Sequence, residues 1–434
     1  MTEIRHLEVR AAVGVIFGAA SIVFWSISRR LDLSTEKFLS LFLWTYAVTR
    51  IAVFVLVFLV LRIQPGGDVT VYYVPEGTGI LAGGTLYKDV LTPHAPLDGY
   101  ILAAILWIHH SAQAIIFFAV LADIAAVWLW MRAAKSFLPQ TTLFAACALL
   151  FVNPTQLMSV DVDGQFNALI SLFLALAVLA VVRNREFLSG LWVGMSAATV
   201  KFLTLIFAPG FLFISRRRTF AVLGFLIALV GIYGGFAAHG INIAYPLHAE
   251  ANHKTDANLI FLVELITGHD VGNRLPDVIL GLCWLVVVAA TFVGMRRAPD
   301  DRSSQLRVLL FSLVAELMCI QVLSKNTWDR YLVMAMFPMC TLIAEFTFTE
   351  IVLYAGWAAV YVFAPSIWSI LLHFQPATAL HSTLFHSALV GGFLLPCDAI
   401  VVCGNAWLLY RSVQLMLRIP RASVLSEEAT LMAT

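Results

Sequence analysis

Residues 111–131 read SAQAIIFFAVLADIAAVWLWM and contain a single charged side chain, Asp123. A helix over this stretch is long enough to cross a hydrocarbon core about 30 Å thick. Apolar runs of roughly 17 to 25 residues, the length that such a crossing requires, recur along the whole chain. Because the runs are continuous rather than alternating, they predict helices and exclude a closed β-barrel.

The composition agrees with an all-α, polytopic transmembrane protein. Of the 434 residues, 61% are hydrophobic and 12% are charged, whereas an ordinary soluble domain has roughly 25% charged residues. We expect about 11 to 13 membrane spans. The full set of predicted spans is 11–28, 38–62, 111–131, 141–158, 166–182, 187–200, 202–214, 219–238, 276–295, 306–323, 331–349, 350–372 and 386–410.

The distribution of basic residues predicts the orientation in the cell membrane. With these spans, seventeen Lys and Arg residues fall on one side and nine on the other, and Arg50 lies within a span. The richer side is expected to be cytoplasmic, which places the large loop after the second span outside. We expect one transmembrane domain over residues 1–421 and a cytoplasmic tail over residues 422–434. No nucleic-acid partner is expected.

The large first outer loop contains the first candidate site. It opens with Asp68 in the stretch Gln64–Tyr73, and Tyr72, Tyr73 and His94 follow. A carboxylate at a membrane surface is well placed to activate an acceptor hydroxyl against a donor carried on a lipid. The alternative is that Asp68 caps or solubilises a loop. The apolar segment 96–110 is too short for a further span and predicts an interfacial helix.

A second polar cluster lies between two predicted spans and contains Asp161, Asp163, Gln165 and Asn167. The Asp163-Gly164 pair also favours a tight bend, so a simple turn is the alternative. Gln165 and Asn167 continue into the next apolar helix, where hydrogen-bonding side chains need partners. We therefore expect this cluster to bind sugar or acceptor hydroxyls, or to brace the Asp68 loop.

Cations at two further positions are candidates for binding a phosphate. Lys201 interrupts an apolar run, where an ammonium is costly unless it reaches the interface or serves a function. Arg330 follows Lys325 and Trp328 in a later outer loop, and its planar guanidinium suits bidentate phosphate binding. Snorkelling of Lys201 and interfacial anchoring by Trp328 are the structural alternatives.

Arg50 lies near the centre of its predicted span, and Glu316 and Asp398 lie in or beside others. Charged groups at this depth usually pair with one another. A structural ion pair inside the membrane is therefore expected.

The order of these features resembles the GT-C class of integral-membrane glycosyltransferases, and in particular glycosyltransferase family 87. The resemblance covers roughly residues 60 to 345. It rests on the Asp68 loop, on residues 164–169 at the start of a span that ends in Arg183-Asn184-Arg185, on Lys201 before a run that ends in Arg216-Arg217-Arg218, and on Trp328-Asp329-Arg330-Tyr331-Leu332.

The resemblance implies an inverting transferase that moves a sugar, with mannose expected, from a polyprenyl phosphate to a glycolipid or glycan acceptor at the outer face. Asp68 would be the general base, and His94 would assist or orient the acceptor. Lys201, Arg330 and Lys325 would hold the donor phosphate. Side chains expected to bind sugar or acceptor are Tyr72, Tyr73, Asp161, Asp163, Gln165, Asn167 and Trp328.

Two points stay open at this level. Gly67 precedes Asp68, so the acidic pair of some GT-C enzymes is missing; we predict no metal or other cofactor, with Asp161 or Asp163 as the alternative route to a divalent cation. GT-C enzymes commonly place the large loop after the first span, so either an extra helix precedes the shared core or the first segment does not cross. A transporter or flippase of lipid-linked sugars is the rival interpretation.

Overall fold

The computed structural model describes residues 2–251, 254–255, 257–298, 301–374 and 395–418. This part of the chain is helical, and its only β-type pairing is an isolated bridge between Leu86 and Val90. The tail at 422–434 and the beginning of the last predicted span, 386–394, lie outside the described residues. The described part of the last predicted span belongs to helix α19, which begins at residue 395 and ends at residue 418.

The helices of the first half follow the predicted spans closely. They are α1 (Thr2–Ser28), α2 (Thr35–Phe54), α3 (Val74–Leu81), α4 (Asp98–Ile108), α5 (Ala112–Ala134), α6 (Gln140–Phe151), α7 (Pro154–Gln156), α8 (Asn167–Val182), α9 (Glu186–Thr199) and α10 (Ala208–Ile214).

The second half continues in the same way. Its helices are α11 (Arg218–Ala238), α12 (Tyr245–Glu250), α13 (Leu259–Thr267), α14 (Arg274–Arg297), α15 (Arg302–Leu323), α16 (Met336–Ala344), α17 (Phe348–Phe374) and α19 (Leu395–Arg418).

Seven of the described helices are long and apolar enough to cross a membrane, and the pair α6 and 154–162, bent by 44°, would make an eighth. The first segment is among the seven, over Arg10–Ser28. The other predicted spans fall on shorter apolar helices, such as α8, or on helices joined to a 3₁₀ turn, such as α10. The chain is a multi-pass helical membrane protein, as the apolar runs predicted.

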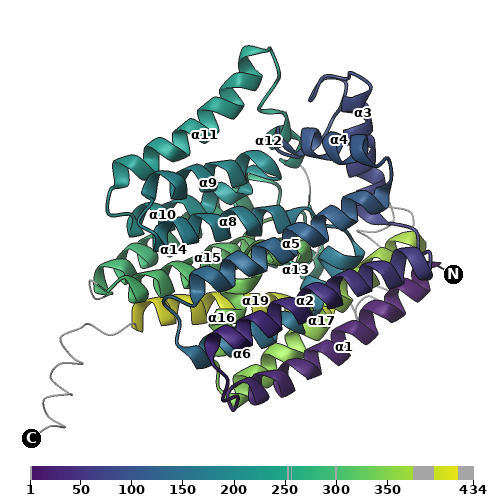
Figure 1. The fold of residues 1–434 in the computed structure, drawn as a ribbon. Coiled ribbons are helices and arrows are strands. Elements are labelled where there is room, and N and C mark those ends of the chain that lie inside the picture. The colour runs from purple at the N-terminus through teal and green to yellow at the C-terminus, as the bar shows by residue number, and fades with distance from the viewer. Residues whose placement is uncertain (1, 252–253, 256, 299–300, 375–394, 419–434) are drawn as a thin grey trace, which may run out of the picture.

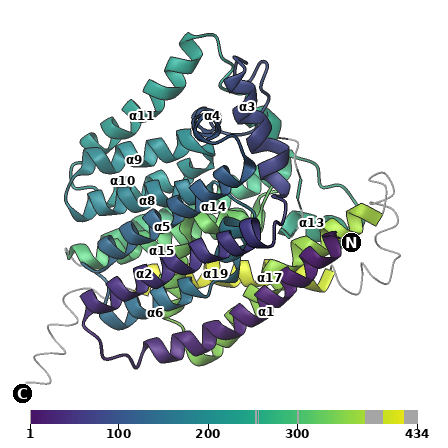
Figure 2. The ribbon, with the colours of Figure 1, turned by 45° about the vertical axis from the view of Figure 1, so that its right-hand side comes forward.

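The bundle has two distinct ends (Figure 1). Helices α3, α4 and α12 gather at one end, beyond the end of α5, and α19 ends at the other. In Figure 2, α4 is seen end-on whereas α5, α8 and α9 run across the view, so α4 lies across the bundle direction. This orientation agrees with the interfacial helix predicted over residues 96–110. We call the end that carries α3 and α4 the site end.

Close packing of small residues holds α9 against α11. A Cβ atom on Gly190 would lie 1.8 Å from the carbonyl oxygen of Ala221, and one on Gly224 would lie 2.0 Å from that of Phe187. Only glycine permits this approach, which is typical of helix pairs in membranes. The contact fixes α9, whose last turn leads directly to Lys201.

Four irregular helices lie at the site end, and each carries or borders a candidate residue. Asp68 precedes the π-helix η2 (Val69–Tyr73), and Asp161 lies in the π-helix η3 (Leu157–Val162). Lys201 precedes the 3₁₀ helix η4 (Phe202–Phe207), and Arg330 lies in the 3₁₀ helix η5 (Asp329–Ala335). A further π-turn, η1 (Val55–Val60), ends the second span. Such segments interrupt the regular hydrogen-bond ladder and often mark functional sites.

Candidate active site

The centre of the site is an ion pair between Asp68 and Arg330. Arg330 Nη1 lies 2.5 Å from Asp68 Oδ2, and the two side chains are 18% and 16% exposed. Gln165 Nε2 donates a hydrogen bond of 3.2 Å to the same oxygen. Both contacts use Oδ2, so they orient the carboxylate while Oδ1 can face a substrate.

Arg330 is itself held from two sides. Its guanidinium carbon lies 4.1 Å from the ring centroid of Trp328, a cation–π distance. Its backbone carbonyl accepts a hydrogen bond of 3.0 Å from Asn167 Nδ2. Burial lowers the pKa of Arg330, but Asp68 and the other acidic and phenolic neighbours together raise it above its usual value. Arg330 therefore presents a fixed, charged guanidinium to the site.

Lys201 approaches the same region from the break between α9 and η4. Its Nζ donates a hydrogen bond of 2.9 Å to the hydroxyl of Tyr331, the residue next to Arg330, and lies 3.6 Å from Glu250 Oε1. The Lys201 side chain is 15% exposed. Burial lowers the pKa of Lys201, while Tyr331 and Glu250 raise it, with a net increase. Two cations from separate segments thus flank Tyr331.

The carboxylates of the second cluster have different surroundings from those of Asp68. Asp161 is completely buried, and its Oδ2 accepts a hydrogen bond of 2.9 Å from Arg50 Nη1. The expected intramembrane pair of Arg50 is thus present, but its partner is Asp161 rather than Glu316 or Asp398. Asp163 pairs with Arg10 of α1, which also lies 3.6 Å from Asp329.

Lys325 does not point toward the Asp68 centre. Its Nζ lies 2.8 Å from Asp277 Oδ2 and donates to the carbonyl of Asn273, so it joins its own loop to the start of α14. The expected role in phosphate binding has no support from this placement, since the amine is satisfied within the protein. Trp328, by contrast, contacts Arg330 as described above.

The aromatic residues and His94 connect the loop to the centre. The hydroxyl of Tyr73 donates a hydrogen bond of 3.3 Å to Gln165 Oε1. The ring centroids of Tyr73 and His94 are 5.3 Å apart. Tyr72 is 43% exposed. His94 is 4% exposed and lies between Glu76 and Asp98. Because its imidazole is buried, His94 is not placed to contact an acceptor, which argues against the expected role.

Several site residues had no clear signal in the sequence. Arg10 stands ahead of the first apolar run, where it looks like an ordinary flanking charge. Tyr331 follows Arg330 and could be taken for an interfacial anchor. Glu76 is 18 residues from His94 in the sequence. Asp98 is four residues from His94. Only the last spacing, His94 to Asp98, offered a hint.

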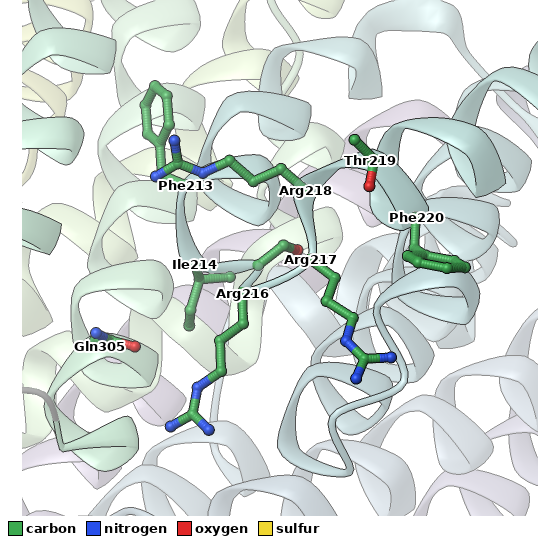
Figure 3. A pocket seen from close by; sticks show the side chains of 9 residues that line it. Phe213, Ile214, Arg216, Arg217, Arg218, Thr219, Phe220 and Gln305 are labelled. Carbon is green, nitrogen blue, oxygen red and sulfur yellow. The ribbon is translucent and has the colours of Figure 1, made fainter.

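A further cavity, drawn in Figure 3, lies at the opposite end of the bundle. It has a volume of about 730 Å³ and is formed by the turn from α10 to α11 with Gln305. The guanidinium groups of Arg216, Arg217 and Arg218 point in different directions rather than toward one centre. The turn resembles the basic loops that flank membrane spans. It is separate from the Asp68 site.

Comparison with known proteins identifies the family of the chain. The model of glycosyltransferase family 87 matches residues 94–324. The chain belongs to glycosyltransferase family 87. The matched residues include Gln165, Asn167 and Lys201, whereas Asp68 and Arg330 lie outside them. The predicted family and its glycosyltransferase class are thus confirmed, and the protein is a membrane glycosyltransferase.

One solved structure is similar in overall course. It is ArnT from Cupriavidus metallidurans bound to undecaprenyl phosphate, with a TM-score of 0.48 and 12% sequence identity. The match covers 86% of this chain and 76% of that chain. No curated protein matched the sequence.

Proposed function

We propose that this glycosyltransferase moves a mannosyl group from a polyprenyl-phosphate donor to a hydroxyl of a glycolipid or glycan, with inversion, and that Asp68 is the general base. The observation that carries the proposal is the Asp68–Arg330 pair of 2.5 Å. It combines a carboxylate, which can take a proton, with a cation, which can bind a departing phosphate, in one partly open site.

The transfer step uses these groups as follows. Asp68 Oδ1 takes the proton of the acceptor hydroxyl as that oxygen bonds to the anomeric carbon. The bond from the anomeric carbon to the phosphate oxygen breaks, and its electron pair stays on the polyprenyl phosphate. Attack opposite to the leaving group inverts the anomeric centre. Positioned bases of this kind contribute about 10²–10⁴-fold to rate.

Arg330 and Lys201 would stabilise the phosphate as its charge develops. Preformed charges aimed at a leaving group act strongly in a site poor in water. Arg330 uses Nη1 for Asp68, which leaves other N–H donors of its guanidinium for phosphate oxygens. We assign this task to the two side chains rather than to a divalent cation.

The sugar and acceptor would lie against the polar side chains around this centre. Asn167 Oδ1 is buried and, among the described residues, receives no hydrogen bond, so it can accept one from a sugar hydroxyl. Trp328 offers an aromatic face, and the exposed Tyr72 is placed to meet an acceptor. Gln165 contacts Asp68 and Tyr73 and is assigned to hold the base.

The site is proposed to face the outside of the cell. The loops at the opposite end of the bundle carry Arg183 and Arg185, the cluster 216–218, and Arg296 and Arg297. Basic loops of this kind stay in the cytoplasm, and the site end is therefore the outer end. The rival transporter hypothesis loses one of its supports, because Arg50 is neutralised by Asp161 within the bundle.

The test is transfer of labelled mannose from a synthetic polyprenyl-phosphate mannose in nanodiscs, with a membrane lipid extract as acceptor. We expect Asp68→Asn to lower the rate about 10²–10⁴-fold without changing the melting temperature. The matched control is Asp89→Asn, an exposed carboxylate in the same loop, which should keep the wild-type rate. Retention of the rate by Asp68→Asn would remove Asp68 as base.

A further inference from the structure

The first outer loop holds a second polar cluster, which the transfer step does not use. Glu76 comes from α3, His94 from the loop, and Asp98 from the first turn of α4. Their exposed fractions are 3%, 4% and 0%. The three side chains therefore meet in the interior of the loop rather than at its surface.

Too many oxygens surround one nitrogen in this cluster. His94 Nδ1 lies 2.8 Å from Glu76 Oε2, 3.0 Å from Thr92 Oγ1 and 3.2 Å from Asp98 Oδ2. A ring nitrogen carries at most one hydrogen, and the Thr92 hydroxyl already donates to Glu76 Oε2 at 2.7 Å. One proton cannot satisfy three converging oxygens.

The carboxylates also lack hydrogen-bond donors. Within the described residues, neither oxygen of Asp98 accepts a hydrogen bond, and the same holds for Glu76 Oε1. Burying an ionised carboxylate without compensation is very costly, and buried charges are normally paired or coordinate metals. With both carboxylates ionised, the cluster keeps a net negative charge whether or not the imidazole is protonated.

We propose that Glu76, His94 and Asp98 bind a divalent transition-metal ion, with Zn²⁺ the best match. One imidazole nitrogen and two carboxylate oxygens form a ligand set that Zn²⁺ accepts, with a fourth position left for water. A doubly charged cation would neutralise the two carboxylates around a neutral imidazole. It would also occupy the point toward which the unsatisfied oxygens converge.

The geometry is close to what such an ion needs. The three ligand atoms lie within 4.8 Å of one another. In a tetrahedral zinc site with bonds of about 2.1 Å, neighbouring ligand atoms are roughly 3.4 Å apart. The observed 2.8 Å and 3.2 Å from His94 Nδ1 therefore require only small side-chain shifts to admit the ion.

The ion would join the loop to the catalytic centre. It links α3, which follows directly from the Asp68 segment, to α4. Between them, Ala95 N donates to Val200 O at 2.9 Å and Leu97 N to Ala198 O at 3.0 Å, which ties the loop to the turn before Lys201. The ring of His94 packs on Tyr73. The ion is thus a positioning element, which acts on the Asp68 centre through Tyr73 and Gln165.

The experiment measures metal directly and needs no donor or acceptor, so its outcome is independent of the proposed reaction. The full chain is purified in detergent without chelator, and its metal content is determined by mass spectrometry. We expect about one Zn²⁺ per chain. After removal of metal with EDTA, added Zn²⁺ should raise the melting temperature by several degrees, since it binds the folded state, while Mg²⁺ should not.

Variants locate the ion. Glu76→Gln and Asp98→Asn should lose both the bound Zn²⁺ and the thermal shift, whereas Asp89→Asn in the same loop should keep both. Should neither carboxylate variant fold, His94→Gln takes their place, and the visible absorption of the Co²⁺-loaded wild type reports an imidazole-containing site. A wild type without a Zn²⁺-dependent shift, or variants that bind Zn²⁺ like the wild type, would overturn the proposal.

Discussion

Two Arg–Asp pairs in this molecule have the same composition, an arginine between an aspartate and an aromatic ring, but they differ in exposure. Arg50 lies 2.9 Å from Asp161 and 4.6 Å from the ring centroid of Tyr46. Arg330 lies 2.5 Å from Asp68 and 4.1 Å from that of Trp328. The first pair is 2% and 0% exposed, and the second is 18% and 16% exposed.

The difference in exposure separates a structural pair from the pair that we propose to be reactive. The Arg50–Asp161 pair belongs to a closed network, in which Tyr46 donates to Asp123 at 2.6 Å and Gln156 donates to the same carboxylate. No substrate can reach it without unfolding the bundle. The Arg330–Asp68 pair borders solvent, so a phosphate and a hydroxyl can approach its two halves.

The largest effect is expected from breaking the closed pair. Arg50→Leu should destabilise the folded protein by about 3–5 kcal/mol, because it leaves the Asp161 carboxylate buried without its cation. The measurement is the melting temperature in detergent, together with the yield of monodisperse protein. The change should appear as a loss of folded protein rather than as an altered rate per folded molecule.

A double variant sharpens this result. Replacing both partners, as in Arg50→Met with Asp161→Leu, should recover most of the lost stability, since hydrophobic pairs often substitute for buried ion pairs at little cost. A single variant that melts like the wild type would show that Asp161 does not depend on Arg50, and the distinction between the two pairs would then fail.

The sequence could predict the fold because its signal is carried by long segments. Continuous apolar runs determine the helices, and the flanking arginines determine their direction, so α5, α8 and α15 appear where they were expected. Lys201 became a candidate for a related reason, since a charge that interrupts an apolar run requires a partner or a function. Arg330 became one because its planar guanidinium, in an outer loop, suits phosphate binding.

The pairing of side chains could not be predicted in the same way. Asp68 and Asp161 were both candidate site carboxylates, and only the three-dimensional arrangement separates Asp68 beside Arg330 from Asp161 beside Arg50. Hydropathy does not encode which helices become neighbours, so Arg50 had no identifiable partner. The same limit hid Glu76, which meets His94 only because α3 folds back against α4.

The second largest effect is expected at the open pair. Arg330→Gln should lower kcat about 10²–10³-fold, the cost of removing one group that stabilises developing charge, with little change in melting temperature. Arg307→Gln is the matched control, because Arg307 pairs with Glu345 at the other end of the bundle and should keep the wild-type kcat. A fall in stability with an unchanged kcat would make the Arg330 pair structural, like that of Arg50.

The smallest effect is expected at Lys201. It tests whether Lys201 contributes to binding of the donor phosphate in addition to Arg330. A lysine acts on phosphate as a point charge, and its loss should cost roughly 1.4 kcal/mol, which is about tenfold in donor binding. Lys201→Met should therefore raise KM for the polyprenyl-phosphate donor about tenfold and change kcat less than Arg330→Gln does. Tyr331→Phe removes the hydrogen bond of 2.9 Å to Lys201 but keeps the ammonium, so its KM should stay closer to that of the wild type. If Lys201→Met leaves KM unchanged and only lowers the melting temperature, Lys201 stabilises the break between α9 and η4. The proposed phosphate binding by Arg330 would then not depend on Lys201.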